Sequence, residues 1–243
     1  MPSGYIDLHC HWIPNIDDGA RSVEDGLRML AELGALGFRT VVATPHMRPG
    51  LFDNTRVDLE NAYAQVQPVV VSKPDLPQIA LSSEHYLDDT VFQRLLAGSG
   101  LPYPGGRAVL IELSPVECPS LLDYRLVDLC RHRLIPVIAH PERYQYIWKA
   151  PEKLEQLIRA GAATLLDIGA LEGAYGREPR RCAEQLLERG LYHAACSDAH
   201  RVADIDHVLA GMEAIERRYG REEVEYLFHT GPQALLDGRV PDL

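Results

Sequence analysis

The chain has 243 residues, of which 46% are hydrophobic and 24% are charged, and its formal net charge is −11 at pH 7. This composition is typical of a globular protein with a full core, and the acidic balance argues against binding to nucleic acid or an anionic membrane surface. No apolar stretch is long enough to span a bilayer, and the first residues lack the pattern of a signal peptide. We therefore expect a cytoplasmic protein without membrane insertion.

Seven short apolar segments rich in β-branched residues alternate with stretches of helical periodicity, as in parallel strands joined by helices. The expected strands cover residues 5–9, 40–46, 78–84, 108–114, 135–140, 163–169 and 193–200. No glycine-rich phosphate loop follows the first strand, which favours a closed barrel over an open, doubly wound sheet. The expected fold is a single α/β domain over residues 1–243, a TIM-like barrel with one strand fewer.

The segments between the expected strands carry the signals of helix ends. Ser22 is expected to cap the first helix, with Asp25 three residues later. Pro151 fits the first position of the helix that contains "EKLEQLIRAG". Residues 204–220 and 221–228 indicate two further helices near the end of the chain.

Side chains that bind metal ions recur where the expected strands end, and in an α/β barrel these ends form the active site. Six of the seven strands carry such residues there, whereas the strand over 163–169 offers only Asp167 and Glu172. The residues at the six ends are His9, His11, His46, Glu84, Glu112, His140, Asp198 and His200.

Two pairs of these residues, His9 with His11 and Asp198 with His200, are separated by one position, so that on a strand both members point to the same side. Imidazole nitrogen and carboxylate oxygen together suit zinc, manganese or iron, and a carboxylate can bridge two ions. Asp17 or Asp18, in the loop after the first strand, can add an oxygen ligand. The remaining histidines are expected at surface or capping positions: His85, His132, His193, His207 and His229.

The five cysteines form no C-x-x-C pair, which argues against a disulfide framework or a structural zinc site. A cysteine-dependent phosphatase needs an arginine six residues after its cysteine to hold the phosphate. The cysteines are Cys10, Cys118, Cys130, Cys182 and Cys196, and the positions six residues later hold Ile16, Tyr124, Pro136, Glu188 and Val202. We expect five free thiols and no cysteine nucleophile.

In order and spacing, these residues resemble the polymerase and histidinol phosphatase (PHP) superfamily of metal-dependent phosphoesterases, which fold as a distorted seven-stranded barrel. More narrowly, the chain resembles the bacterial tyrosine-protein phosphatases of capsular and exopolysaccharide operons. The similar segments are "DLHCHWIPNIDDGARSVEDGLRML", "VVATPHMRPGLF", "LIELSP", "PVIAHPERY" and "ACSDAH". Among them, "DDG" after H-x-H and "AHPERY" are the most specific.

The resemblance implies three divalent metal ions, with manganese as the usual activator and iron or zinc as other options. By this resemblance, one ion would be bound by His9, His11, Glu84 and Asp198, a second by Glu84, Glu112 and His140, and a third by Asp18, His46 and His200. Glu84 would bridge the first two ions.

The predicted function is hydrolysis of phosphotyrosine on a protein by a metal-bound hydroxide, with ions neutralising the phosphoryl oxygens. Arg48, Arg143 and Arg201 follow ligands at strand ends and are expected to bind the phosphate, and the predicted catalytic residues are Arg48, Arg143, Asp198 and His200. The resemblance implies that the substrate is the tyrosine-rich tail of a kinase that regulates polysaccharide synthesis.

Two alternatives remain open at this point. One is a small-molecule phosphomonoesterase of the histidinol-phosphatase type, which relative rates on the two substrates would distinguish. The other is a catalytically idle metal-binding interaction module, which the complete set of ligand-type residues argues against. A nuclease of the polymerase-associated kind would need a basic face, which a net charge of −11 does not favour.

Overall fold

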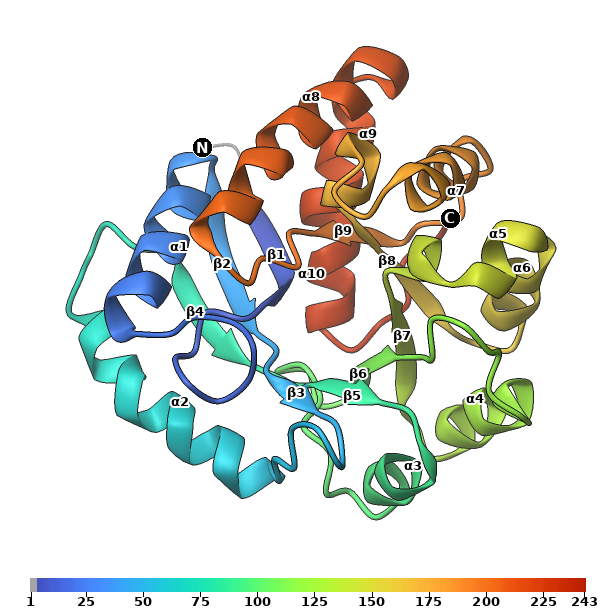
Figure 1. Cartoon of the computed structure of the whole chain (residues 1–243), viewed down its shortest axis with the longest axis horizontal. Helices are drawn as coiled ribbons and strands as arrows, with labels where there is room; N and C mark the ends of the chain where they lie inside the picture. Colours follow the sequence, from blue (N-terminus) through green and yellow to red (C-terminus); the bar gives the residue numbers. More distant parts are fainter. Residues whose placement is uncertain (1–3) are drawn as a thin grey trace.

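The computed structural model describes residues 4–243 and contains, within that range, nine strands surrounded by helices (Figure 1). The strands are β1 (Tyr5–Cys10), β2 (Phe38–Ala43), β3 (His46–Met47), β4 (Gln78–Leu81), β5 (Glu84–Tyr86), β6 (Ala108–Glu112), β7 (Ile135–Ala139), β8 (Ala163–Asp167) and β9 (Ala194–Cys196). They form a three-stranded sheet in the order β1-β2-β4 and a six-stranded sheet in the order β3-β5-β6-β7-β8-β9. Every neighbouring pair is parallel, as expected for strands joined by helices.

Two of the expected strands are each divided between the two sheets. β2 and β3 together occupy the strand expected over 40–46, and β4 and β5 occupy the one expected over 78–84. The opposite edges also meet, because the Asp198 amide donates to the His9 carbonyl at 2.9 Å and the His11 amide donates to the Ala199 carbonyl at 2.9 Å. The fold is therefore an α/β fold in which parallel strands surround one interior.

The α-helices lie outside the strands (Figure 1). They are α1 (Val23–Ala35), α2 (Arg56–Val71), α3 (Asp89–Leu96), α4 (Leu122–Arg131), α5 (Gln145–Lys149), α6 (Glu152–Arg159), α7 (Arg177–Glu188), α8 (Asp206–Tyr219), α9 (Arg221–Glu225) and α10 (Gly231–Leu236). Short 3-10 turns η1 (Pro141–Arg143), η2 (Ile168–Glu172) and η3 (Val202–Ile205) follow β7, β8 and β9, and a π-helical turn η4 (Tyr226–Thr230) joins α9 to α10.

The predicted helix starts agree closely with the structure. The Ser22 side chain accepts a hydrogen bond from the Asp25 amide at 3.1 Å and caps α1, which confirms that prediction. Pro151 occupies the N-cap of α6 rather than its first turn, a shift of one position. The segment expected as one helix over 221–228 divides into α9 and the start of η4.

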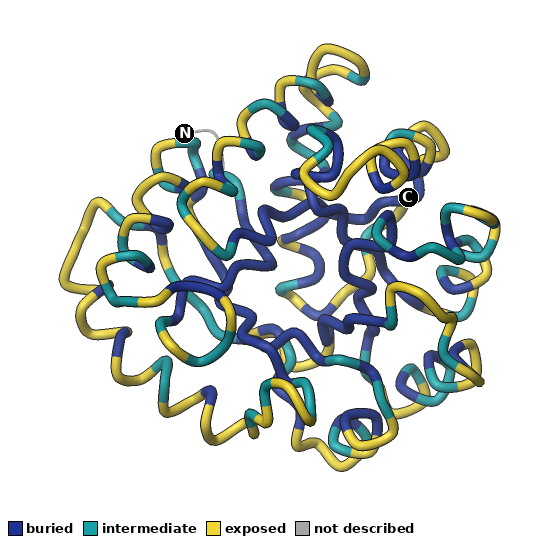
Figure 2. Tube along the Cα trace, in the orientation of Figure 1, coloured by how far each residue is buried: buried dark blue, intermediate teal, exposed yellow. Residues whose placement is uncertain are grey.

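Apolar side chains form one core between strands and helices and a second core inside the ring of strands. Along β6, Ala108 and Leu110 belong to the inner core, whereas Val109 and Ile111 belong to the outer one. The buried Tyr103 ring fills part of the interior, and its hydroxyl donates to the Leu8 carbonyl at 2.9 Å. Figure 2 shows that the central strands are buried while the helices expose their outer faces.

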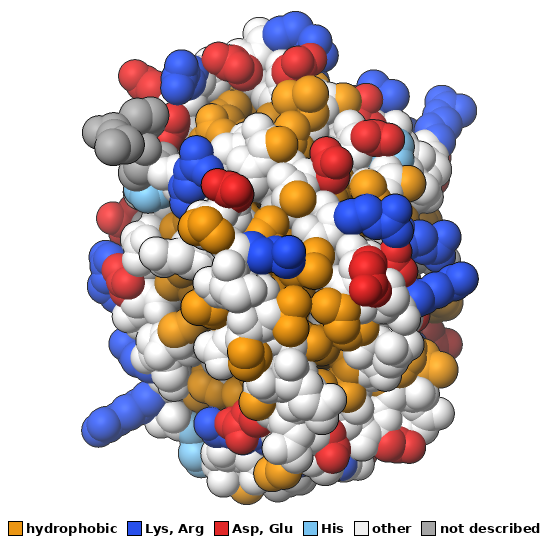
Figure 3. Space-filling model, turned by 90° about the vertical axis from the view of Figure 1, so that its left-hand side faces the viewer, with side chains coloured by type: hydrophobic (Ala, Val, Ile, Leu, Met, Phe, Trp, Pro, Cys, Tyr) orange, Lys and Arg blue, Asp and Glu red, His pale blue; other side chains and the backbone are white. Residues whose placement is uncertain are grey.

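Among the described residues, no helix is long and apolar enough to cross a bilayer. Figure 3 shows acidic and basic side chains interspersed, with apolar ones between them, on the face that forms the left side of Figure 1.

Candidate metal centre

Four buried ligand atoms meet where the ends of β1, β5 and β9 come together. His9 Nε2 lies 3.1 Å from His11 Nε2, 3.2 Å from Glu84 Oε2 and 3.2 Å from Asp198 Oδ1. His11 Nε2 lies 3.5 Å from Glu84 Oε2 and 3.6 Å from Asp198 Oδ1. Five of the six edges of this four-atom cluster thus span 3.1 to 3.6 Å.

This spacing fits a divalent ion. Neighbouring ligands of zinc or a similar ion, with bonds of about 2.1 Å, lie roughly 3.4 Å from one another. The Asp198 Oδ1 atom is buried and has no hydrogen-bond partner among the described residues, which is costly for a carboxylate unless a cation binds it. The four residues are therefore suited to hold a metal ion.

Glu84 connects this cluster to a second group of ligand-type residues. Its Oε2 atom faces His9 and His11, while its Oε1 atom lies 2.9 Å from His140 Nε2. Ligand atoms of His46, Glu84 and Glu112 also lie within 4.8 Å of one another. The structure therefore places Glu112 with His46 and Glu84, and His140 on the other oxygen of Glu84. This arrangement is suited to a bridging carboxylate.

A third group lies closer to the surface. Asp18 Oδ1 is 3.4 Å from His46 Nε2 and 3.5 Å from His200 Nε2, and His11 belongs to the same group. The rings of His11 and His200 stack with centroids 4.0 Å apart. The structure thus brings together all nine side chains that the sequence selected as ligands.

Two candidate ligands, His140 and Asp198, have positive φ angles. Asp198 and His140 have φ angles of +46° and +35°, in the left-handed region that residues other than glycine rarely adopt. Asp198 and His200 consequently follow β9 in a loop and do not lie on a strand, contrary to the strand expected over 193–200. Such conformations persist where the surrounding structure enforces them, and they cluster at functional sites.

Two aspartates support the histidine segment, Asp17 at the His11 ring and Asp7 at the His9 backbone, and sequence reasoning gave neither of them this role. The Asp17 carboxylate lies 2.7 Å from His11 Nδ1 and accepts a hydrogen bond from the His46 amide at 3.1 Å. The buried Asp7 carboxylate accepts from Ser197 Oγ at 2.5 Å and from the His9 amide at 3.3 Å. A carboxylate on the second ring nitrogen, as Asp17 is for His11, fixes the orientation of a metal-binding histidine. Asp7 instead holds the backbone of His9 next to Ser197. The "DDG" motif was the available signal for Asp17.

The glycine of the "DDG" motif, Gly19, is required by a close approach of two backbone segments. A Cβ atom at this position would come within 2.1 Å of the His11 carbonyl oxygen, so only glycine lets the loop fold back onto the histidine strand. The loop accordingly returns with a hydrogen bond from the Ala20 amide to the His11 carbonyl at 2.9 Å. This contact keeps Asp17 and Asp18 next to the histidines.

Burial and neighbouring charges shift the pKa values of several side chains in the cluster. Burial and the nearby Glu84 carboxylate raise the pKa of Glu112 to about 7. Burial opposes ionisation of Glu84 as well, but His9 and His46 outweigh it and hold the pKa of Glu84 well below its usual value. Burial, and then the Arg143 charge, lower the pKa of His140 to about 4, which leaves its ring neutral and able to bind a cation.

Arg143 lies at the mouth of the cluster. Its Nη1 atom donates to Asp198 Oδ2 at 2.7 Å and lies 3.6 Å from Asp167 Oδ2, and its guanidinium lies over the Tyr175 ring at 4.3 Å from the centroid. Arg48 lies on another side, 3.5 Å from Glu112 and 4.3 Å from the Tyr86 ring centroid. Arg201 is exposed and lines the same cavity as Arg143. The volume of this cavity is about 330 Å³.

Two histidines predicted at surface or capping positions are buried instead. His85 donates from Nδ1 to the Leu110 carbonyl at 2.8 Å, and its Nε2 accepts from the Leu101 amide at 3.0 Å. His193 Nδ1 accepts from the Thr164 amide at 3.1 Å. Backbone groups therefore satisfy these rings, which explains how they can be buried without a metal.

The cysteines offer no reactive thiolate. All five are free, and burial raises the pKa of each thiol: Cys10, Cys118, Cys130, Cys182 and Cys196. A nucleophilic cysteine needs a lowered pKa, usually next to a positive charge. The arrangement is therefore unlike that of a cysteine-dependent phosphatase.

The chain is an α/β protein whose parallel strands carry histidines and carboxylates at one end, a site suited to divalent metal ions. Residues 5–237 match the family model of capsular polysaccharide synthesis proteins CpsB/CapC. Because this match covers nearly the whole chain, the chain belongs to the CpsB/CapC family, and the resemblance stated from the sequence is confirmed.

Named relatives and a solved structure agree with this assignment. The chain is 31% identical over 233 residues to the tyrosine-protein phosphatase YwqE of Bacillus subtilis, covering 95% of this chain and 91% of the relative. It is 27% identical to the tyrosine-protein phosphatase CpsB of Streptococcus pneumoniae, covering 95% and 98%. A crystal structure from work on YwqE and CpsB, described as unique metal-dependent tyrosine phosphatases, superposes with a TM-score of 0.88 at 30% identity and covers 98% of this chain and 96% of that one.

Proposed function

We propose that this chain is a metal-dependent protein-tyrosine phosphatase that acts in capsular or exopolysaccharide synthesis. The observation that carries the proposal is the cluster of His9, His11, Glu84 and Asp198, whose spacing fits a metal ion, with Arg143 bonded to the outer oxygen of Asp198. The family of the chain and the names of its relatives support the same activity.

We assign nine side chains as ligands of three divalent ions, with manganese as the physiological metal ahead of iron or zinc. The ligands are His9, His11, Asp18, His46, Glu84, Glu112, His140, Asp198 and His200. Their convergence from distant parts of the chain supports the assignment. Bound ions would supply an activated water molecule and neutralise phosphoryl oxygens.

In this proposal the arginines bind the phosphate and the remaining residues hold the site in place. Arg143 and Arg48 are half-buried next to ligand carboxylates, so each can turn part of its guanidinium toward a phosphoryl oxygen. Arg201 would contact the phosphate from the exposed side. Asp198 and His200 are assigned to catalysis through the ions that they hold.

The wider context is also part of the proposal. The whole chain would form one domain, and its nine strands would correspond to a distorted seven-stranded barrel in which β2 with β3 and β4 with β5 count as one strand each. The protein would act in the cytoplasm on a phosphotyrosine protein, such as the tail of a tyrosine kinase. The hydrogen bonds between the His9–His11 segment and the Asp198–Ala199 segment support closure of the barrel.

The decisive test is hydrolysis of a phosphotyrosine peptide by the purified chain with added Mn²⁺, with chelator, and after thiol alkylation. We expect activity with Mn²⁺, loss of at least a hundredfold with chelator, and little change after alkylation, since no thiol is placed to act as nucleophile. Inactivation by alkylation while the metal content is unchanged would contradict the proposal. A higher catalytic efficiency on histidinol phosphate would instead assign the small-molecule reaction.

A further inference from the structure

A second cavity of about 330 Å³ opens next to the metal centre, between the start of α1 and the turn η3. Its lining includes Arg21, Arg28, Arg201 and His200. It shares His200 and Arg201 with the cavity that contains Asp198. The second cavity is therefore adjacent to the one at the metal centre, within reach of a side chain that neighbours a phosphorylated residue bound there.

The charge of this cavity is opposite to that of the chain as a whole. Three exposed arginines line it, and Asp25 is the one carboxylate among its lining residues in the described part of the chain. Arg28 contacts Asp25, whereas Arg21 and Arg201 form no ion pair within residues 4–243. Two guanidinium groups thus remain available to an incoming anion in a protein of net charge −11.

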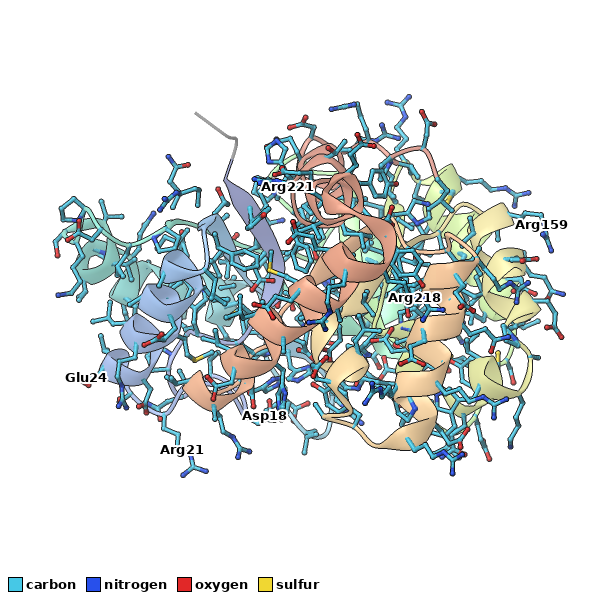
Figure 4. All side chains as sticks on the ribbon, turned by 90° about the horizontal axis from the view of Figure 1, so that it is seen from above. Asp18, Arg21, Glu24, Arg159, Arg218 and Arg221 are labelled. Carbon is cyan, nitrogen blue, oxygen red and sulfur yellow. The ribbon has the colours of Figure 1, made fainter. Side chains whose placement is uncertain are left out.

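Hydrogen bonds and a helix cap fix the backbone next to Arg201 and Arg21. The Asp204 carboxylate accepts hydrogen bonds at 2.9 Å from the amides of both His200 and Arg201. Arg21 directly precedes Ser22, the cap of α1. Figure 4 shows Arg21 and Asp18 at the same edge of the molecule and Arg159 at a distant end. The backbone positions from which Arg21 and Arg201 extend are thus held next to the metal centre.

We propose that the cavity formed by Arg21, Arg28 and Arg201, here named the arginine pocket, binds an anionic side chain next to the phosphotyrosine of the substrate. The preferred substrate segment would then carry an acidic residue, or a second phosphorylated one, within a few positions of the residue that is hydrolysed. This inference rests on the proposed phosphatase function and adds the sequence context that the site selects.

The test compares kcat/KM of the Mn²⁺-bound chain on one phosphotyrosine peptide with Glu, Gln, Lys or a second phosphotyrosine at the neighbouring positions, and on free phosphotyrosine. Exposed ion pairs contribute about 0.2 to 1 kcal/mol each, so two of them predict a preference of Glu over Gln of roughly two- to thirtyfold. Lys should be the poorest neighbour. The preference should shrink at high salt, since the pairs are exposed. A second phosphotyrosine that exceeds Glu would identify the bound anion as phosphate.

The variant Arg21→Ala should lower kcat/KM on the Glu peptide toward the value for Gln, and Arg28→Ala should lower it less because Arg28 already contacts Asp25. Arg21→Glu should abolish the preference for Glu over Gln. Arg159→Ala, at the distant end of the molecule, is the matched control and should keep the wild-type preference. Free phosphotyrosine has no neighbouring side chain, so its hydrolysis reports on the metal centre alone.

The outcomes separate the two proposals. Metal-dependent hydrolysis of free phosphotyrosine together with equal rates on the Glu and Gln peptides would overturn the arginine pocket and leave the proposed function intact. A preference for Glu that keeps its wild-type size in both alanine variants would also overturn it. Absence of any hydrolysis of phosphotyrosine by the wild-type chain would overturn the proposed function and the arginine pocket with it.

Discussion

Arg143 contacts a candidate metal ligand, Asp198, and a second buried carboxylate, Asp167, and it lines the cavity next to them. It bonds to Asp198, lies 3.6 Å from the buried Asp167 and stacks on Tyr175. Burial and the Asp198 charge raise the pKa of Asp167 to about 7, which the nearby guanidinium partly opposes. Asp167 and Tyr175 therefore hold Arg143 in position, which gives a role to Asp167, one of the two ligand-type residues that the sequence offered at this strand end.

The substitution Arg143→Ala tests this position directly. It removes a charge-assisted hydrogen bond to the phosphate, worth on the order of 1.5 to 3 kcal/mol, so kcat/KM on a phosphotyrosine peptide should fall roughly ten- to a hundredfold. Arg143→Lys should be intermediate, because it keeps the charge and loses the planar fork. Elemental analysis provides the control. A loss of activity that follows the loss of bound metal would show that Arg143 acts through Asp198 and does not contact the phosphate.

At the scale of elements, the sequence predicts which segments form strands better than where each strand stops. Hydrophobic runs locate the interior of β6, β7 and β8 because these strands are buried on both faces. Periodicity does not reveal the left-handed φ at Asp198, which ends β9 early and places the last ligands in a loop. Such a conformation depends on contacts with β1, distant in the sequence.

The candidate ligands were accessible to sequence reasoning because they are chemically distinctive residues at strand ends. The residues behind them were not, because their roles depend on long-range contacts. Asp7 is joined to Ser197 across 190 positions, and no spacing in the sequence announces that pair. The buried His85 and His193 were misplaced for the same reason, since their partners are backbone groups of other strands.

His193 lies at the end of β8 and β9 that is remote from the metal centre. It should make the stability of the fold depend on pH. Burial lowers the pKa of His193 to about 4, and its Nδ1 accepts from the Thr164 amide, a bond that protonation abolishes. The folded state therefore binds fewer protons than the unfolded state, whose histidine titrates near 6.5, so this contribution to stability is present above pH 6.5 and is lost as the pH falls toward 4.

The variant His193→Asn keeps a hydrogen-bond acceptor near the Thr164 amide and removes the titration. Between pH 7 and pH 5 the wild-type chain should lose on the order of 2 kcal/mol more unfolding free energy than the variant. Urea unfolding of both chains in chelator at the two pH values measures this difference. Parallel pH profiles for the two chains would show that His193 does not titrate differently in the folded state.

At the scale of the whole molecule, the candidate ligands extend from His9 on β1 to His200 after β9, so they meet only when the ring of strands is complete. An unfolded chain cannot reproduce this arrangement. Metal binding must therefore stabilise the folded state, by about 2.7 kcal/mol for each ion present at 100 times its dissociation constant. The concentration of buried carboxylates adds to the effect, because a cation relieves their repulsion.

Thermal unfolding should show this coupling without any substrate. For a chain of this size, about 1 kcal/mol shifts the melting temperature by roughly 2 to 4 °C, so each saturating ion should raise it by about 5 to 10 °C above the value in chelator. Asp198→Asn weakens one anionic ligand and should reduce both the shift and the bound metal, whereas Arg159→Ala should leave both unchanged. A melting temperature that is the same with Mn²⁺ and with chelator, in a chain that elemental analysis shows to bind metal, would mean that the ions bind outside this ring of strand ends.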